Sequence, residues 1–96
     1  MDVLESAAVD AALAEGFAWK REGDELIQVH KERDFAGALE FVNKVGALAE
    51  QADHHPDIDI RWNTVTLRLS THSAGGITEA DLRLAKQIDA ISQSQD

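Results

Sequence analysis

Apolar residues recur every three to four positions over residues 2–15, and again over residues 35–52 and 79–92. Spacing of this period is typical of helices that bury one face. Gly16 follows the first segment as a stop signal, Asp34 precedes the second as an N-cap, and Thr78 precedes the third. The pattern therefore predicts three helices. The apolar stripe of the second would comprise Phe35, Ala38, Leu39, Phe41, Val42, Val45, Leu48, Ala49 and Ala52.

Between these segments, apolar residues alternate with polar ones, as they do in strands with one buried face. Residues 17–33 hold two such stretches, the first opening with Phe17 and Trp19, around a turn at residues 22–25. This arrangement predicts a β-hairpin. Residues 58–62 and 64–70 alternate in the same way around a bend at Asn63. They are expected to form a second hairpin.

The predicted order of elements is α-β-β-α-β-β-α, within one domain spanning all 96 residues. Hairpins separated by helices favour an α+β fold, in which a four-stranded antiparallel sheet carries helices packed on one face. Such a sheet leaves at least one edge to be covered or paired, which favours a homo-oligomer.

Composition narrows the classes of function. The chain has no cysteine, which excludes disulfides, thiolate metal sites and a catalytic thiol. No apolar run approaches the roughly 20 residues of a membrane span. The first residues include the acidic Asp2 and Glu5, whereas a signal peptide begins with basic residues. We therefore expect a cytoplasmic protein with no membrane contact. Its 18 acidic and 9 basic residues give a net charge of −9, which argues against direct binding to nucleic acid.

Three of the four histidines are expected to meet in space. His54 and His55 precede the third predicted strand, and His72 follows the fourth. If these strands form a hairpin, the start of one lies beside the end of the other. Glu50 on the last turn of the second helix and Asp81 on the first turn of the third would then border a histidine cluster.

Three interpretations of this cluster stay open on the residues alone. Imidazoles and a carboxylate can bind zinc or iron, but adjacent histidines in an extended segment point to opposite sides, which disfavours one shared metal. Imidazole also suits acid–base catalysis, because its unperturbed pKa is about 6.5. In the structural interpretation, Asp81 forms a capping box with Thr78 and the histidines hydrogen-bond to loops.

The spacing of these residues resembles a known signature. Glu50-x-x-x-His54-His55-Pro56, followed by Trp62, His72 and Asp81, is similar to the pattern of the pterin-4a-carbinolamine dehydratase family. The resemblance extends from about Trp19 to Ile91. Flanking matches include Asp34-Phe35, Phe41, Ser70-Thr71-His72 and Gly75-Gly76-Ile77-Thr78.

The resemblance implies a specific activity. The family removes water from 4a-hydroxytetrahydropterin, the product that aromatic amino-acid hydroxylases release, and gives quinonoid dihydropterin for recycling. It uses neither a metal nor an organic cofactor, and its members are dimers or tetramers. A functional link to an aromatic amino-acid hydroxylase is therefore expected.

The resemblance also implies roles for residues. His54 and His72 would transfer protons, His55 would bind and orient the pterin, and Glu50 would orient His54. Asp81 completes the expected catalytic set, and Trp62 would be a packing wall. The residues expected to line the substrate pocket are Asp53, His54, His55, Ser70, Thr71, His72 and Ser73.

Three positions depart from the family's pattern. The family commonly has aromatic residues where His30 and Glu32 stand, and often an acidic residue at Ser73. We interpret the first two as an altered strand face or interface. A non-catalytic binding or assembly protein on the same fold is the competing hypothesis, because fold does not dictate function.

Overall fold

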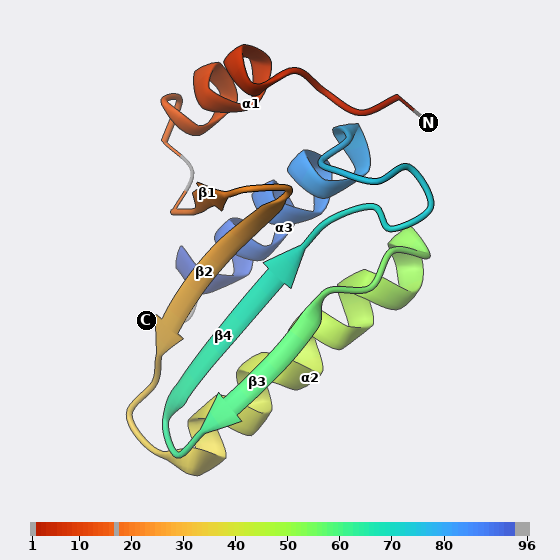
Figure 1. The fold of residues 1–96 in the computed structure, drawn as a ribbon. Coiled ribbons are helices and arrows are strands. Elements are labelled where there is room, and N and C mark those ends of the chain that lie inside the picture. The colour runs from red at the N-terminus through yellow and green to blue at the C-terminus, as the bar shows by residue number, and fades with distance from the viewer. Residues whose placement is uncertain (1, 17, 94–96) are drawn as a thin grey trace.

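The elements of the computed structural model follow the order that the hydrophobic pattern predicts (Figure 1). The structure describes residues 2–16 and 18–93. The elements are α1 (Ser6–Leu13), β1 (Lys20–Glu22), β2 (Glu25–Lys31), α2 (Phe35–Ala52), β3 (Asp57–Arg61), β4 (Thr64–Leu69) and α3 (Glu79–Gln93).

The local signals set the helix ends with one exception. The carboxylate of Asp34 accepts a hydrogen bond from the Gly37 N–H at 2.8 Å, so α2 begins where its N-cap predicts. Helix α1 is shorter than the predicted range of 2–15. It starts only at Ser6 because the preceding residues are extended, and the Leu4 N–H donates to the Ile77 carbonyl at 2.8 Å.

Both predicted hairpins are present in the sheet. Strand β1 pairs with β2, and β3 pairs with β4 around a two-residue turn at Trp62 and Asn63. The expected contribution of Phe17 to the first hairpin lies outside the described residues. The two hairpins are joined by antiparallel pairing of β2 with β4, in register from Leu26 opposite Leu69 to Lys31 opposite Thr64. The resulting strand order is β1-β2-β4-β3.

Helices α2 and α3 cover one face of the sheet, as predicted (Figure 1). The buried positions of α2 are Ala38, Phe41, Val45 and Ala49, whereas Phe35, Leu39 and Ala52 are exposed. The predicted stripe was therefore too wide. Only the side of α2 that faces the sheet and α3 is covered, and Phe35 and Leu39 lie outside it.

A buried carboxylate fastens α3 to the sheet far from the histidines. Asp89 accepts hydrogen bonds from the Trp19 indole N–H at 2.9 Å, from the Gln28 amide at 2.8 Å and from the Ala18 N–H at 3.1 Å. Each of these donors would be costly to bury without an acceptor. Asp89 thereby ties the segment before β1, strand β2 and helix α3 together.

Candidate active site

The histidine-bearing segments meet at the end of the sheet where β3 begins and β4 ends (Figure 1). Asp57 lies opposite Arg68 in the β3–β4 register, so residues 53–56 and 70–73 emerge at the same end. The first turn of α3 also lies there, because Asp81 contacts both segments. The hairpin argument from the sequence predicts this placement.

The C-terminus of α2 directs the two adjacent histidines. Asp53 adopts the left-handed conformation, with φ of 50° and ψ of 43°. The His54 N–H donates to the Ala49 carbonyl at 3.1 Å, and the Asp53 N–H to the Glu50 carbonyl at 3.3 Å. These two bonds form a Schellman motif, which ends the helix with a sharp turn of the chain.

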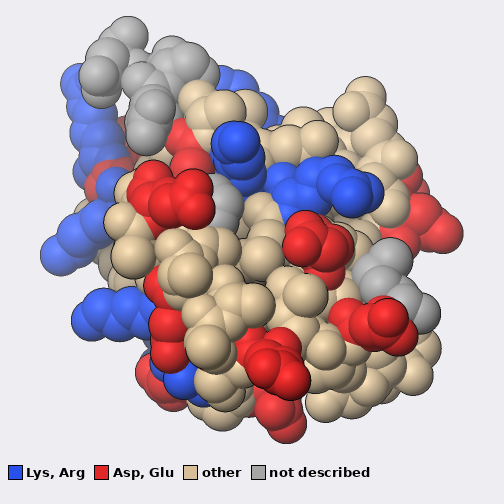
Figure 2. All heavy atoms as spheres, turned by 90° about the horizontal axis from the view of Figure 1, so that it is seen from above, with Lys and Arg blue, Asp and Glu red and all other residues tan. Residues whose placement is uncertain are grey.

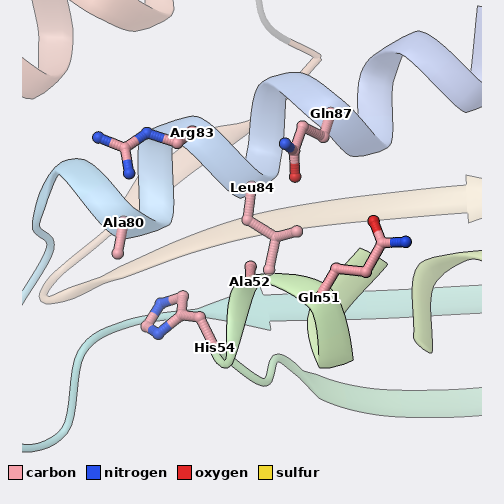
Figure 3. Close-up of a pocket in the computed structure, with 7 residues that line it drawn as sticks. All are labelled: Gln51, Ala52, His54, Ala80, Arg83, Leu84 and Gln87. Carbon is pink, nitrogen blue, oxygen red and sulfur yellow. The ribbon is translucent and has the colours of Figure 1, made fainter. Parts of the chain in front are cut away.

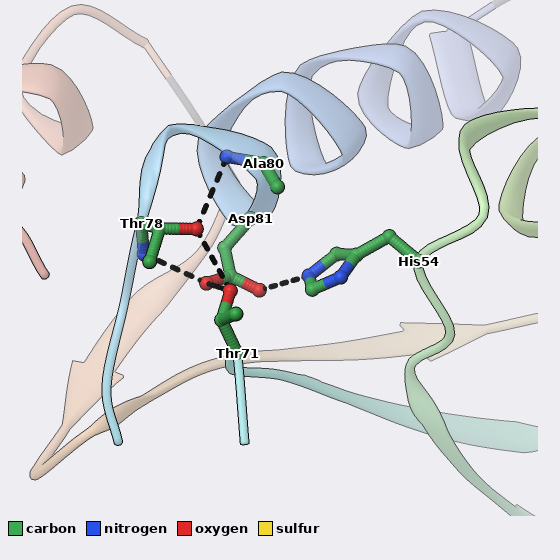
Figure 4. A network of polar contacts seen from close by, with 5 residues as sticks. All are labelled: His54, Thr71, Thr78, Ala80 and Asp81. Carbon is green, nitrogen blue, oxygen red and sulfur yellow. Dashed lines mark hydrogen bonds and ion pairs between the residues drawn. The ribbon is translucent and has the colours of Figure 1, made fainter. Parts of the chain in front are cut away.

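His54 is held by a buried carboxylate. Its Nε2 lies 2.5 Å from Oδ1 of Asp81, which is fully buried (Figure 4). The other oxygen, Oδ2, accepts hydrogen bonds from the Thr78 N–H at 2.8 Å and the Thr71 hydroxyl at 2.9 Å. An ionised carboxylate only accepts hydrogen bonds, so it fixes the hydrogen on Nε2 and leaves Nδ1 for another partner.

Asp81 also caps α3, as the structural interpretation of the sequence predicts. Its bond from the Thr78 N–H, together with the bond from the Ala80 N–H to the Thr78 hydroxyl at 3.3 Å, forms the expected capping box (Figure 4). The Thr71 and Thr78 hydroxyls are 2.7 Å apart and complete the network. One carboxylate therefore fixes the start of the helix and the orientation of His54.

The predicted partner of Glu50 was wrong. Glu50 Oε2 lies 2.5 Å from Nε2 of His55, whereas His54 pairs with Asp81. The left-handed turn at Asp53 sends the His54 ring toward α3 and leaves the His55 ring beside the last turn of α2, which carries Glu50. Glu50 and His55 are both exposed, so this pair is weaker than the buried one.

The loop after β4 carries the remaining predicted residues. Thr71 pairs with Gly76 through its N–H, which donates to the Gly76 carbonyl at 2.8 Å, so residues 72–75 form a tight turn. Within the described part of the chain, the exposed His72 side chain has no hydrogen-bond partner, which leaves its ring free for a ligand. Ser73 is also exposed, whereas the Thr71 hydroxyl points inward and supports Asp81.

Trp62 does not line this site. It lies at the tip of the β3–β4 hairpin, at the opposite end of β3 from the histidines, and is 65% exposed. The expectation that it forms a packing wall was therefore wrong within this chain, because the hairpin carries its turn away from the strand ends that bear the histidines.

A cavity of about 450 Å³ lies beside His54, between the last turn of α2 and the first half of α3 (Figure 3). It is lined by Gln51, Ala52, His54, Ala80, Arg83, Leu84 and Gln87. His54 is the only predicted site residue among them. The sequence analysis missed Arg83 and the two glutamines, because their meeting depends on how α2 packs against α3. The four-residue spacing of Arg83 and Gln87 was the one signal available.

One further property bears on ligands. Among the described residues, no three histidine, aspartate or glutamate side chains gather closely enough to hold a metal ion.

None of the described helices is long and apolar enough to cross a membrane. At the end of the molecule that carries α1, Lys and Arg side chains lie next to Asp and Glu side chains (Figure 2). Single positions on this surface are therefore basic although the net charge of the chain is −9.

Comparison with known proteins gives a consistent result. Residues 2–91 match the family described as pterin 4 alpha carbinolamine dehydratase. A protein of Nocardia farcinica, provisionally named a pterin-4-alpha-carbinolamine dehydratase, is 46% identical over 92 residues, which is 96% of this chain and 97% of that protein.

Two solved structures share the fold. The crystal structure of a transcriptional coactivator/pterin dehydratase from Brucella melitensis superposes with a TM-score of 0.88 at 30% identity, over 94% of this chain and 98% of that one. A pterin dehydratase-like protein identified as a RuBisCO assembly factor in the alpha-carboxysome has a TM-score of 0.66 at 24% identity. That match covers 79% of this chain and 90% of the other.

Proposed function

The chain belongs to the pterin-4a-carbinolamine dehydratase family, and from this premise we propose that it removes water from 4a-hydroxytetrahydropterin to give quinonoid dihydropterin. The observation that carries the proposal is the His54–Asp81 pair. A buried carboxylate holds the ring of His54 at the sheet end where His55 and His72 also emerge.

The reaction requires two proton transfers. The bond between C4a and its hydroxyl oxygen breaks, an acid protonates the oxygen, and the oxygen leaves as water. A base takes the proton from the neighbouring ring nitrogen, and the freed electron pair forms the new C=N bond. Imidazoles suit both tasks near neutral pH and typically contribute about 10²–10⁴-fold each. The proposal needs no metal and no organic cofactor.

We assign His54 and His72 to proton transfer and His55 to binding the pterin. Asp81 orients His54, the task that the family resemblance implied for Glu50, and Glu50 orients His55 instead. Asp53, Ser70 and Ser73 are proposed to contact the substrate. Thr71 acts through Asp81, because its hydroxyl already bonds that carboxylate.

Other parts of the proposal concern cellular context. The substrate is produced by aromatic amino-acid hydroxylases, so we propose a functional link to such an enzyme in the cytoplasm. We also propose a homodimer or homotetramer. Beyond Ile27, strand β2 has no partner on its β1 side among the described residues, which leaves residues 28–31 as an open edge.

The test is a stopped-flow dehydration assay with enzymatically generated 4a-hydroxytetrahydropterin. We expect the protein to accelerate dehydration clearly over buffer, and His54→Ala and His72→Ala each to lose at least tenfold, as removal of a proton-transfer group does. His30→Phe is the matched control. This fourth histidine stacks on Phe41 at the far end of β2, so its replacement should leave the rate within about twofold.

Two outcomes would count against the proposal. No acceleration by the unmodified protein would favour the competing hypothesis of a non-catalytic binding or assembly protein on the same fold. Activity lost in a chelator and restored by zinc would show that a metal takes part.

A further inference from the structure

The cavity beside His54 has a polar wall of exposed side chains that have no partner among the described residues. Arg83 and Gln87 lie one turn apart on α3. Gln51, on the last turn of α2, points toward Gln87, whereas the guanidinium of Arg83 points the other way, past Ala80 (Figure 3). Leu84, almost fully buried, lies between them. His54 lies at one end of this group and the two glutamines lie at the other (Figure 3). None of these three polar side chains bonds to another described residue.

The guanidinium of Arg83 is the charged group of this wall. Three other arginines of the chain pair with carboxylates, namely Arg21 with Asp10, Arg61 with Asp59 and Arg68 with Glu25. Glu79 lies one turn before Arg83 on α3, yet no ion pair within 4 Å joins them in the described structure.

A guanidinium that has no carboxylate partner offers a planar set of N–H donors that matches phosphate or carboxylate oxygens. The amides of Gln51 and Gln87 add further donors at the other end of the cavity (Figure 3). The wall of the cavity is therefore suited to an anionic group.

We propose that this cavity is the subsite for the substituent at C6 of the pterin, and that Arg83 selects a substrate whose substituent is anionic. This inference rests on the proposed function. C4a, N5 and C6 are consecutive atoms of the pterin ring, so a histidine that acts at C4a or N5 lies next to the root of the C6 substituent. His54 is both that histidine and one of the residues that line the cavity. A substituent at C6 would therefore extend from the reacting atoms into the cavity.

The test compares two ligands that differ only in an anionic phosphate group on the C6 substituent. The probes are 7,8-dihydroneopterin, which has a neutral trihydroxypropyl substituent, and its 3′-phosphate, with affinities measured by isothermal titration calorimetry. We expect the unmodified protein to bind the phosphate ester at least tenfold more tightly, as a charge-assisted bidentate contact would allow. Arg83→Gln should abolish this preference and leave the affinity for the neutral compound unchanged. Arg83→Lys should restore part of it.

Lys86→Gln is the matched control, because it removes the same charge one turn further along α3 from a residue that does not line this cavity. It should leave the preference intact. Equal binding of both probes by the unmodified protein would overturn the inference. So would an Arg83→Gln variant that binds both probes more weakly by the same factor. In either case, dehydration in the stopped-flow assay would leave the proposed function standing. If the protein neither binds a probe nor accelerates dehydration, the proposed function fails and the inference fails with it.

Discussion

Asp81 serves two purposes at a single position. Its Oδ2 accepts the Thr78 N–H and the Thr71 hydroxyl, and its Oδ1 faces Nε2 of His54. Because the first set of bonds fixes the carboxylate on α3, the direction of Oδ1 is set before a substrate arrives. A catalytic imidazole benefits from such a fixed acceptor, since its tautomer and its ring orientation are both decided in advance.

Replacing Asp81 with Asn should separate the two purposes. The amide oxygen can still accept the Thr78 N–H, but the amide N–H₂ facing His54 cannot accept a hydrogen bond from Nε2. We expect the dehydration kcat to fall at least tenfold in the stopped-flow assay. The free energy of unfolding, measured in urea, should fall by about 1–2 kcal/mol.

Asp89→Asn offers a control on the same helix. Asp89 is the other buried carboxylate of α3 and bonds Trp19 and Gln28, away from the histidines. Its replacement should destabilise the protein but leave kcat unchanged. An unchanged kcat in Asp81→Asn would contradict the proposal that Asp81 orients His54. A kcat that falls by the same factor in Asp89→Asn would also contradict it.

At the scale of elements, the end of α2 decides the geometry of the site. Asp53 occupies a left-handed conformation that glycine adopts at lower cost than other residues. The chain thus keeps a less favourable residue at the turn that sends His54 and His55 in different directions. A direct contact between the Asp53 carboxylate and the pterin, as proposed above, would account for it.

Asp53→Gly should therefore gain stability and lose affinity. We expect the free energy of unfolding to rise by about 0.5–1 kcal/mol, because glycine relieves the left-handed strain. The KM for 4a-hydroxytetrahydropterin should rise because the carboxylate is gone. Asp53→Ala is the companion variant. It should show the same KM as Asp53→Gly, but a lower free energy of unfolding than that variant. If Asp53→Gly is less stable than the unmodified protein, the conformational argument is wrong. An unchanged KM would remove Asp53 from the substrate contacts.

At the scale of the whole molecule, the open edge of β2 is the feature that favours the proposed oligomer. Val29 on this edge segment is 65% exposed, and residues 28–31 lack a neighbouring strand on that side among the described residues. Exposed strand edges of this kind pair readily with another chain. A second copy of the same chain would close the edge and cover Val29.

Light scattering coupled to size exclusion should therefore give a mass of two or four chains. Val29→Asp should shift the mass toward one chain, because like charges would face one another across the paired edges. Trp62→Asp is the control, since Trp62 is as exposed as Val29 but lies at the hairpin tip. A monomeric unmodified protein would refute the proposed oligomer, and dissociation by Trp62→Asp instead would move the interface to the hairpin tip.

Much of this molecule is determined by local sequence. Asp34 caps α2 where its side chain predicts, the alternation of apolar residues predicts both hairpins, and the order of His54, His55 and His72 around the second hairpin places them at one end of the sheet. These features depend on residues close together in the chain, whose hydrogen bonds and burial repeat with the period of a helix or a strand. The family resemblance also rests on spacing, and residues 2–91 bear it out.

Only the tertiary structure decided which groups meet. The pairing of β2 with β4, the exposure of Phe35 and Leu39, and the cavity lined by Arg83 all depend on how the hairpins and helices pack. The pairing of His54 with Asp81 rather than with Glu50 has the same origin. The family resemblance implied that Glu50 orients His54, but one left-handed residue at Asp53 turned His54 toward a carboxylate 27 positions away. Such a choice depends on side-chain directions after packing, which the periodicity of the sequence does not contain.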